Sequence, residues 1–199
     1  MKKISTTIIL LIAVMMTNVQ TANAQWTIAN LSAPRTSLCY RCWHQSFFAG
    51  GVNVSPFNPY SVVDIYDNGT GLWTTANLSV ARKNLSATAV GSKAFFAGGI
   101  GTNSSSVVDI YNNSTGLWTT ANLSAARSHL SATAVGTKAF FAGGVFSNNT
   151  TSSIVDIWNN SNGVWTTAKL SVARRNLSAA TLDTKVFLQE AESSSFFLQ

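Results

Sequence analysis

The residues best suited to metal or redox chemistry lie together near the start of the chain, at Cys39, Cys42 and His44. Haem attachment of the c type needs a histidine directly after the second cysteine, and here Trp43 intervenes. A structural zinc site needs four ligands, and the second histidine, His129, lies far along the chain. An exported chain could form a Cys39–Cys42 disulfide. We predict no metal, haem or other cofactor at this segment.

Two sister copies of this segment suggest where it comes from. The copies read "RKNLSATAVGSKAFFAGG" from Arg82 and "RSHLSATAVGTKAFFAGG" from Arg127, whereas the stretch from Arg35 reads "RTSLCYRCWHQSFFAGG". The flanks match, and the middle is one residue shorter and differs throughout. One coding of the sister strand, entered two bases late, translates as "CYRCWHQSF". We hypothesise a sister strand read out of frame, and we interpret residues 189–199 as an out-of-frame tail.

The sister copies belong to a repeat with a period of 45 to 48 residues. Four independent features keep this period, and together they are strong evidence for a repeat architecture. They are the tryptophans at 26, 73, 118 and 165, the arginines at 35, 82, 127 and 174, the glycine pairs at 50–51, 98–99 and 143–144, and the "VVDIY" or "IVDIW" strings at 62–66, 107–111 and 154–158.

One unit predicts four short strands, at 85–90, 93–99, 106–111 and 117–124. A two-residue turn at Gly91-Ser92 suits a type II′ hairpin, and strand 106–111 is rich in β-branched residues. No stretch of the mature chain shows a helical period, so we expect an all-β fold.

Double glycine, a tyrosine after a β-branched strand and a tryptophan seven residues later resemble the kelch repeat. The resemblance implies a kelch-type β-propeller, here incomplete. Three full four-stranded blades would cover 35–79, 82–124 and 127–171, and the hairpin 174–188 with the strand 25–32 would supply part of a fourth. Whether such a ring closes is left open, because closed propellers have four or more blades. We expect the glycines to let backbone run close to neighbouring aromatic rings, which fill the space between blades.

The first 24 residues have the pattern of a secretory signal peptide: Lys2 and Lys3, then a short apolar run, then Ala22-Asn-Ala24. We expect the mature chain, residues 25–199, to be exported to the periplasm or outside the cell, with no membrane span. The formal charge of +6 is spread singly or in pairs, which argues against a nucleic-acid partner. Open strand edges would favour self-association.

Near-identical repeats offer no unique pair of carboxylates for acid–base work, so we expect no catalysis. The favoured function is binding of a protein or a glycan through loops on a rigid scaffold. The alternatives are a decayed fragment and the remnant of an enzyme related to the copper oxidases or sugar-isomerising proteins that resemble this fold.

The arginine row offers candidate ligand-binding residues, Arg82, Arg127 and Arg174, because a guanidinium suits carboxylate or phosphate oxygens. An acidic sugar would be a suitable ligand. The favoured alternative is that each arginine pairs with an aspartate of the row 64, 109 and 156. Glycan acceptors at Asn68, Asn77, Asn113 and Asn122 would matter only in a source that glycosylates exported proteins.

Overall fold

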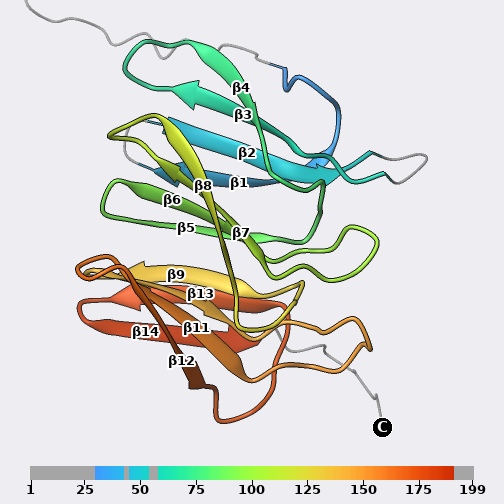
Figure 1. The fold of residues 1–199 in the computed structure, drawn as a ribbon, viewed down its shortest axis with the longest axis vertical. Coiled ribbons are helices and arrows are strands. Elements are labelled where there is room, and N and C mark those ends of the chain that lie inside the picture. The colour runs from blue at the N-terminus through green and yellow to red at the C-terminus, as the bar shows by residue number, and fades with distance from the viewer. Residues whose placement is uncertain (1–29, 43–44, 54–57, 191–199) are drawn as a thin grey trace, which may run out of the picture. The chain divides into compact units, whose positions relative to one another are not determined.

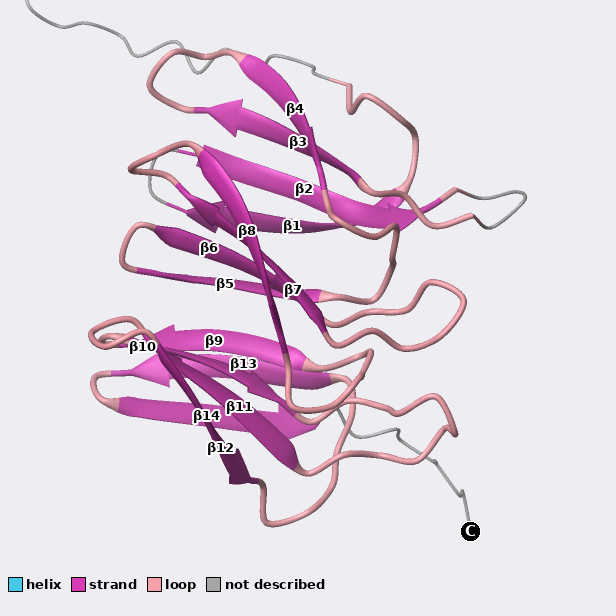
Figure 2. Cartoon of the chain, in the orientation of Figure 1, coloured by secondary structure: helices cyan, strands magenta, loops and turns pink. Residues whose placement is uncertain are grey.

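The computed structural model describes residues 30–42, 45–53 and 58–190, which contain strands and turns and no helix (Figures 1 and 2). Residues 31–42, 45–53 and 58–190 belong to one compact unit. The expected all-β class is therefore confirmed for the described residues. They hold no helix long and apolar enough to cross a bilayer.

The strands of the described part form four antiparallel sheets, each from one repeat. The first sheet contains β1 (Thr36–Cys42), β2 (Gln45–Val52), β3 (Val62–Asp67) and β4 (Trp73–Asn77). The second contains β5 (Ser86–Val90), β6 (Lys93–Ala97), β7 (Val107–Asn112) and β8 (Leu117–Asn122). The third contains β9 (Ser131–Val135), β10 (Lys138–Ala142), β11 (Ile154–Asn159) and β12 (Val164–Lys169). The last contains β13 (Leu177–Leu182) and β14 (Lys185–Glu190).

Each predicted strand of the second unit is present within a few residues of its expected bounds. The Gly91 turn closes β5 onto β6 with φ +56° at the glycine, as a II′ turn requires at its first central residue. At the matching place in the last sheet Asp183 adopts φ +51°, so an aspartate occupies the conformation that its sisters give to glycine.

The sheets pack against one another in chain order through their faces. The first strands lie side by side, β1 next to β5, β5 next to β9 and β9 next to β13. Aromatic rings cross between sheets: Phe47 contacts Phe96 and Tyr111, and Phe95 contacts Trp158. The prediction that aromatic side chains fill the space between sheets is confirmed at these positions.

The paired glycines have a different role from the one expected. A Cβ on Gly98 would lie 2.5 Å from the carbonyl oxygen of Arg127, and one on Gly143 would lie 2.5 Å from that of Arg174. Their closest neighbours are thus the backbone of the next repeat's arginine and a leucine, and the expected contact with an aromatic ring is wrong. Each glycine permits the close backbone approach that joins one sheet to the next.

The unusual first repeat still forms a regular hairpin. Cys42 pairs with Gln45 across a two-residue connection, as Val90 pairs with Lys93 in the second sheet. The missing residue is absorbed by a register shift between Thr36 and Leu38. The strand is therefore formed despite its altered sequence, and residues 43 and 44 lie outside the described residues.

These sheets do not establish the expected propeller, since none of the described sheets closes on itself. The strand expected at 25–32 lies mostly outside the described residues. Its last residues, 30–32, are not in a strand, although the Ser32 amide donates to Asp64 at 3.2 Å.

Candidate functional site

Each complete sheet contains one buried ion pair between its first arginine and the aspartate of its third strand. The pairs are Arg35–Asp64, Arg82–Asp109 and Arg127–Asp156. The arginine side chains have no exposed surface, and each aspartate residue is only 3% exposed. The expectation that the arginine row pairs with the aspartate row is confirmed for these three arginines.

Further hydrogen bonds hold each ion pair in place. Arg82 donates to the carbonyl oxygens of Val107 (2.7 Å) and Phe96 (3.1 Å), so it ties the third strand to the second. The Ser79 amide donates to Asp109 at 2.9 Å, which fixes the chain entering the sheet. Burial lowers the pKa of Arg82 from its ordinary value, and the charge of Asp109 partly offsets this effect.

The three arginines considered as ligand-binding residues differ in whether their guanidinium groups are already bonded within the protein. Arg82 and Arg127 are enclosed by protein acceptors. Arg174 is partly exposed, and within the described residues its side chain takes part in no ion pair. Of the three, only Arg174 therefore has a guanidinium that remains available.

The structure describes the backbone of most of the cysteine segment, and the expected absence of a metal there stays a prediction. Cys39 and Cys42 lie on β1, and His44 lies outside the described residues. No group of three potential metal ligands comes together in the described ranges.

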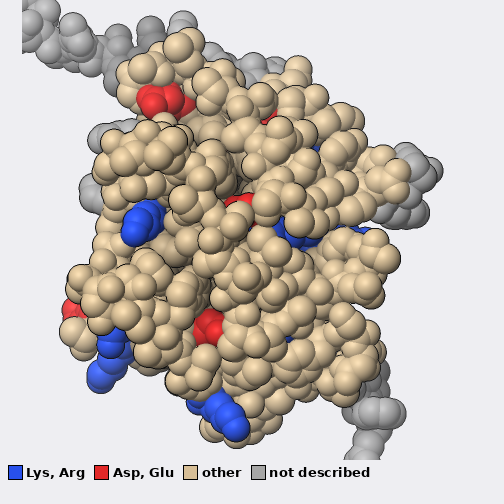
Figure 3. Space-filling model, viewed as in Figure 1, with Lys and Arg blue, Asp and Glu red and all other residues tan. Residues whose placement is uncertain are grey.

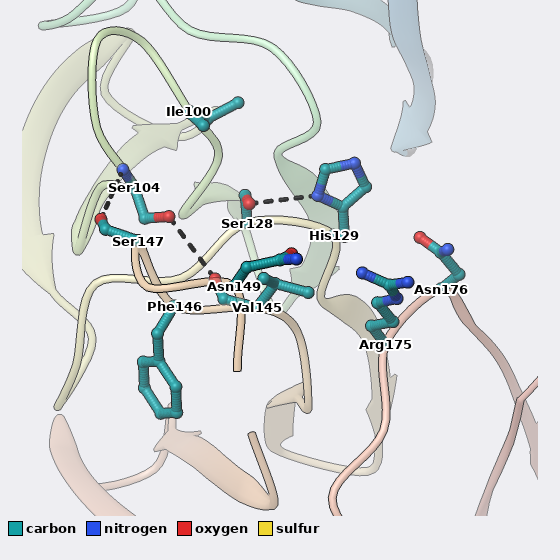
Figure 4. Close-up of a pocket in the computed structure, with 10 residues that line it drawn as sticks. All are labelled: Ile100, Ser104, Ser128, His129, Val145, Phe146, Ser147, Asn149, Arg175 and Asn176. Atoms are coloured by element: carbon teal, nitrogen blue, oxygen red, sulfur yellow. Dashed lines mark hydrogen bonds between the residues drawn. The ribbon is translucent and has the colours of Figure 1, made fainter. Parts of the chain in front are cut away.

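A polar pocket of about 410 Å³ opens among loops of the second, third and last repeats (Figure 4). Pockets of this volume are typical of small-ligand sites. The side chains that line it and can form hydrogen bonds come from four segments of the second, third and last repeats: Ser104, Ser128, His129, Ser147, Asn149, Arg175 and Asn176.

Backbone hydrogen bonds hold the loops of this pocket rigidly. The amide of His129 donates to the Asn84 carbonyl at 3.0 Å, and the amide of Asn176 donates to the His129 carbonyl at 3.1 Å. These three residues occupy the same position in successive repeats and all have φ between +51° and +55°. Asparagine and histidine adopt this left-handed conformation more readily than most residues. The row therefore connects three successive repeats through backbone hydrogen bonds, and two of its residues line the pocket.

Charge in the pocket comes from His129 and Arg175. Burial lowers the pKa of His129, and the nearby charges of Arg175 and Lys83 lower it further, so the imidazole is neutral near pH 7. The Ser128 hydroxyl lies 3.1 Å from Nδ1 of His129. The pocket thus offers one permanent cation, a neutral imidazole, and several hydroxyl and amide groups.

No model of a known protein family matches this chain. No curated protein matches it at a significant level.

The sequence could have predicted this pocket, but the repeated arginines were considered in place of the residues that follow them. The two positions after each repeat arginine read Lys-Asn, Ser-His and Arg-Asn in units that are otherwise nearly identical. Loops 100–106 and 145–153 also differ in length and composition. The pocket is therefore lined at positions where the near-identical repeats differ from one another.

Charged groups elsewhere are sparse. On the face in Figure 3, lysine, arginine and acidic side chains are separated by uncharged surface. Four of the potential glycan acceptors, Asn68, Asn77, Asn113 and Asn122, are exposed.

Proposed function

We propose that this chain is an exported, kelch-type propeller segment that binds a carbohydrate and performs no catalysis. The observation that carries the proposal is the loop pocket around His129 and Arg175, which joins hydrogen-bonding side chains from several repeats. A rigid scaffold with variable loops is a common way to build a binding site. The neutral imidazole, hydroxyls and amides suit a polyhydroxylated ligand, which presents both donors and acceptors.

Arg175 favours an acidic sugar over a neutral one. A guanidinium binds a carboxylate through two parallel hydrogen bonds, and charge-assisted bonds are about twice as strong as neutral ones. Arg175 is exposed and forms no ion pair in the described part of the chain, so its charge is available to a ligand.

Calorimetric titration tests this proposal with two probes of similar size, trigalacturonate and maltotriose, at low and moderate salt. We expect the acidic probe to bind more tightly and to lose affinity with salt. Arg175→Ala should weaken its binding at least tenfold, because a charge-assisted bond contributes about 1.5–3 kcal/mol. Lys138→Ala, a change at an exposed lysine on β10, is the matched control and should leave binding unchanged.

Two results would overturn the proposal. Binding that Arg175→Ala and Lys138→Ala weaken equally would show only a general charge effect. Absence of binding for a broad panel of acidic and neutral oligosaccharides would leave the decayed fragment as the better description.

A further inference from the structure

The backbone of Arg174 is held in the same way as that of the paired arginines. Its amide donates to the Ser152 carbonyl at 3.0 Å, as the Arg127 amide donates to Ser105 at 3.0 Å. Its carbonyl accepts from Gly144 at 2.8 Å, as that of Arg127 accepts from Gly99 at 2.9 Å. The last repeat therefore starts as the complete ones do.

The partner of Arg174 is missing from the described chain. In complete sheets the aspartate comes from the third strand, and the sheet of β13 and β14 has only two strands there. Each aspartate of the chain lies at a different site from Arg174. Three lie in the ion pairs, Asp67 accepts from the amides of its own turn, and Asp183 lies in the turn between β13 and β14.

The register of the last hairpin fixes where a third strand would lie. Ala179 pairs with Leu188 as Ala87 pairs with Phe96. Phe96 in turn pairs with Asp109 on the third strand. An antiparallel strand added to β14 in this register would put its aspartate opposite Leu188.

In the described part of the chain, the last sheet also has an exposed apolar surface. Phe187 is 51% exposed, whereas its counterparts Phe47 and Phe95 are 1% and 0% exposed beneath the following sheet. Leu182 on β13 is also exposed. Exposed apolar groups beside a free strand edge are typical of surfaces that accept another strand.

We propose that β14 accepts an extended segment of a partner polypeptide with the pattern β-branched, β-branched, Asp, apolar, aromatic. Its backbone pairs with β14, and its aspartate pairs with Arg174, which is strand addition with a charged anchor. This chain's own strands of that pattern cannot serve in a folded second copy, because Asp64, Asp109 and Asp156 are buried and paired. The proposal is independent of the carbohydrate pocket.

Fluorescence anisotropy with a labelled peptide of residues 104–122, "SSSVVDIYNNSTGLWTTAN", tests the proposal on the full chain. The peptide supplies a third and fourth strand with the required aspartate. We expect saturable binding to the wild type, and at least tenfold weaker binding by the peptide whose Asp109 is replaced by Asn. Arg174→Met should cause the same loss, and Lys138→Met, which removes an exposed lysine on β10, should not.

The peptide substitution leaves the protein unchanged, so a folding defect in Arg174→Met would not confuse the test. Equal binding of the Asp and Asn peptides would overturn the aspartate–arginine anchor. Absence of peptide binding to a monomeric wild type would overturn the acceptor edge. A wild-type dimer in sedimentation velocity that Arg174→Met dissociates would show that the occupant is a second copy, which also overturns the proposal.

Discussion

At the scale of single residues, the buried arginine–aspartate pairs determine how each repeat is held together. The pair connects the chain entering a sheet with the second and third strands, because the arginine bonds to their carbonyls and the aspartate accepts a serine amide. Sequence spacing alone predicted these partners, since both residue types recur with the repeat. It could not show that burial is complete, because this depends on packing between sheets.

Arg127→Met should destabilise the fold strongly. It leaves the buried carboxylate of Asp156 without its partner and removes donors to the Gly143 and Ile154 carbonyls. Loss of one member of a buried ion pair typically costs about 3–5 kcal/mol. Urea denaturation should show this loss, and the double variant Arg127→Met/Asp156→Leu should recover part of it. A loss below about 1 kcal/mol would mean that the pair contributes little.

His129 should make stability depend on pH in the acidic range. Its pKa is lowered in the folded protein, so the unfolded chain binds a proton more readily. Stability from this group is therefore complete above its ordinary pKa and decreases as pH falls through the folded-state value. Thermal unfolding from pH 7.5 to 4.5 should show a smaller decrease in Tm for His129→Asn than for the wild type. Asparagine is the matched replacement because sister repeats carry it with the same positive φ. Parallel curves would refute the role of His129.

At the scale of elements, each repeat's strand order followed from its sequence, because β-branched runs and turn residues alternate so regularly. Two features did not follow. The glycine pairs contact the next arginine's backbone, which only the stacking of sheets reveals. The first strand tolerates a missing residue through a register shift, although its residues differ from those of its sisters. Backbone pairing with β2 therefore retains this strand despite its altered side chains.

Gly98→Ala should cost more than Gly116→Ala, although both glycines have similar positive φ, +65° and +72°. At Gly116 nothing lies within 4 Å of an added Cβ, so only the left-handed conformation is penalised, by roughly 1–2 kcal/mol. At Gly98 the added atom would also meet the Arg127 carbonyl and the Leu130 side chain. Urea midpoints should show at least twice the loss for Gly98→Ala. Equal losses would contradict the close approach between the second and third sheets.

At the scale of the whole molecule, near-identical repeats provide the scaffold, and we propose that their few differences provide the binding surface. The regular positions are buried ion pairs, glycines and aromatic contacts between sheets. The variable positions gather in the loops around His129 and Arg175. The last repeat differs in another way, because its arginine has no aspartate among the described residues and its strand β14 has a free edge there. Carbohydrate binding and strand addition are therefore assigned to separate surfaces.

An NMR titration would show whether carbohydrate binds in the loop pocket. Backbone amide shifts of ¹⁵N-labelled protein would be followed as trigalacturonate is added. We expect saturable changes in amide shift with the same dissociation constant at each affected residue. These changes should be concentrated at Ser104, Ser128, His129, Asn149, Arg175 and Asn176. Changes concentrated elsewhere, for example along β14, or no saturable change at any residue, would contradict carbohydrate binding in the pocket.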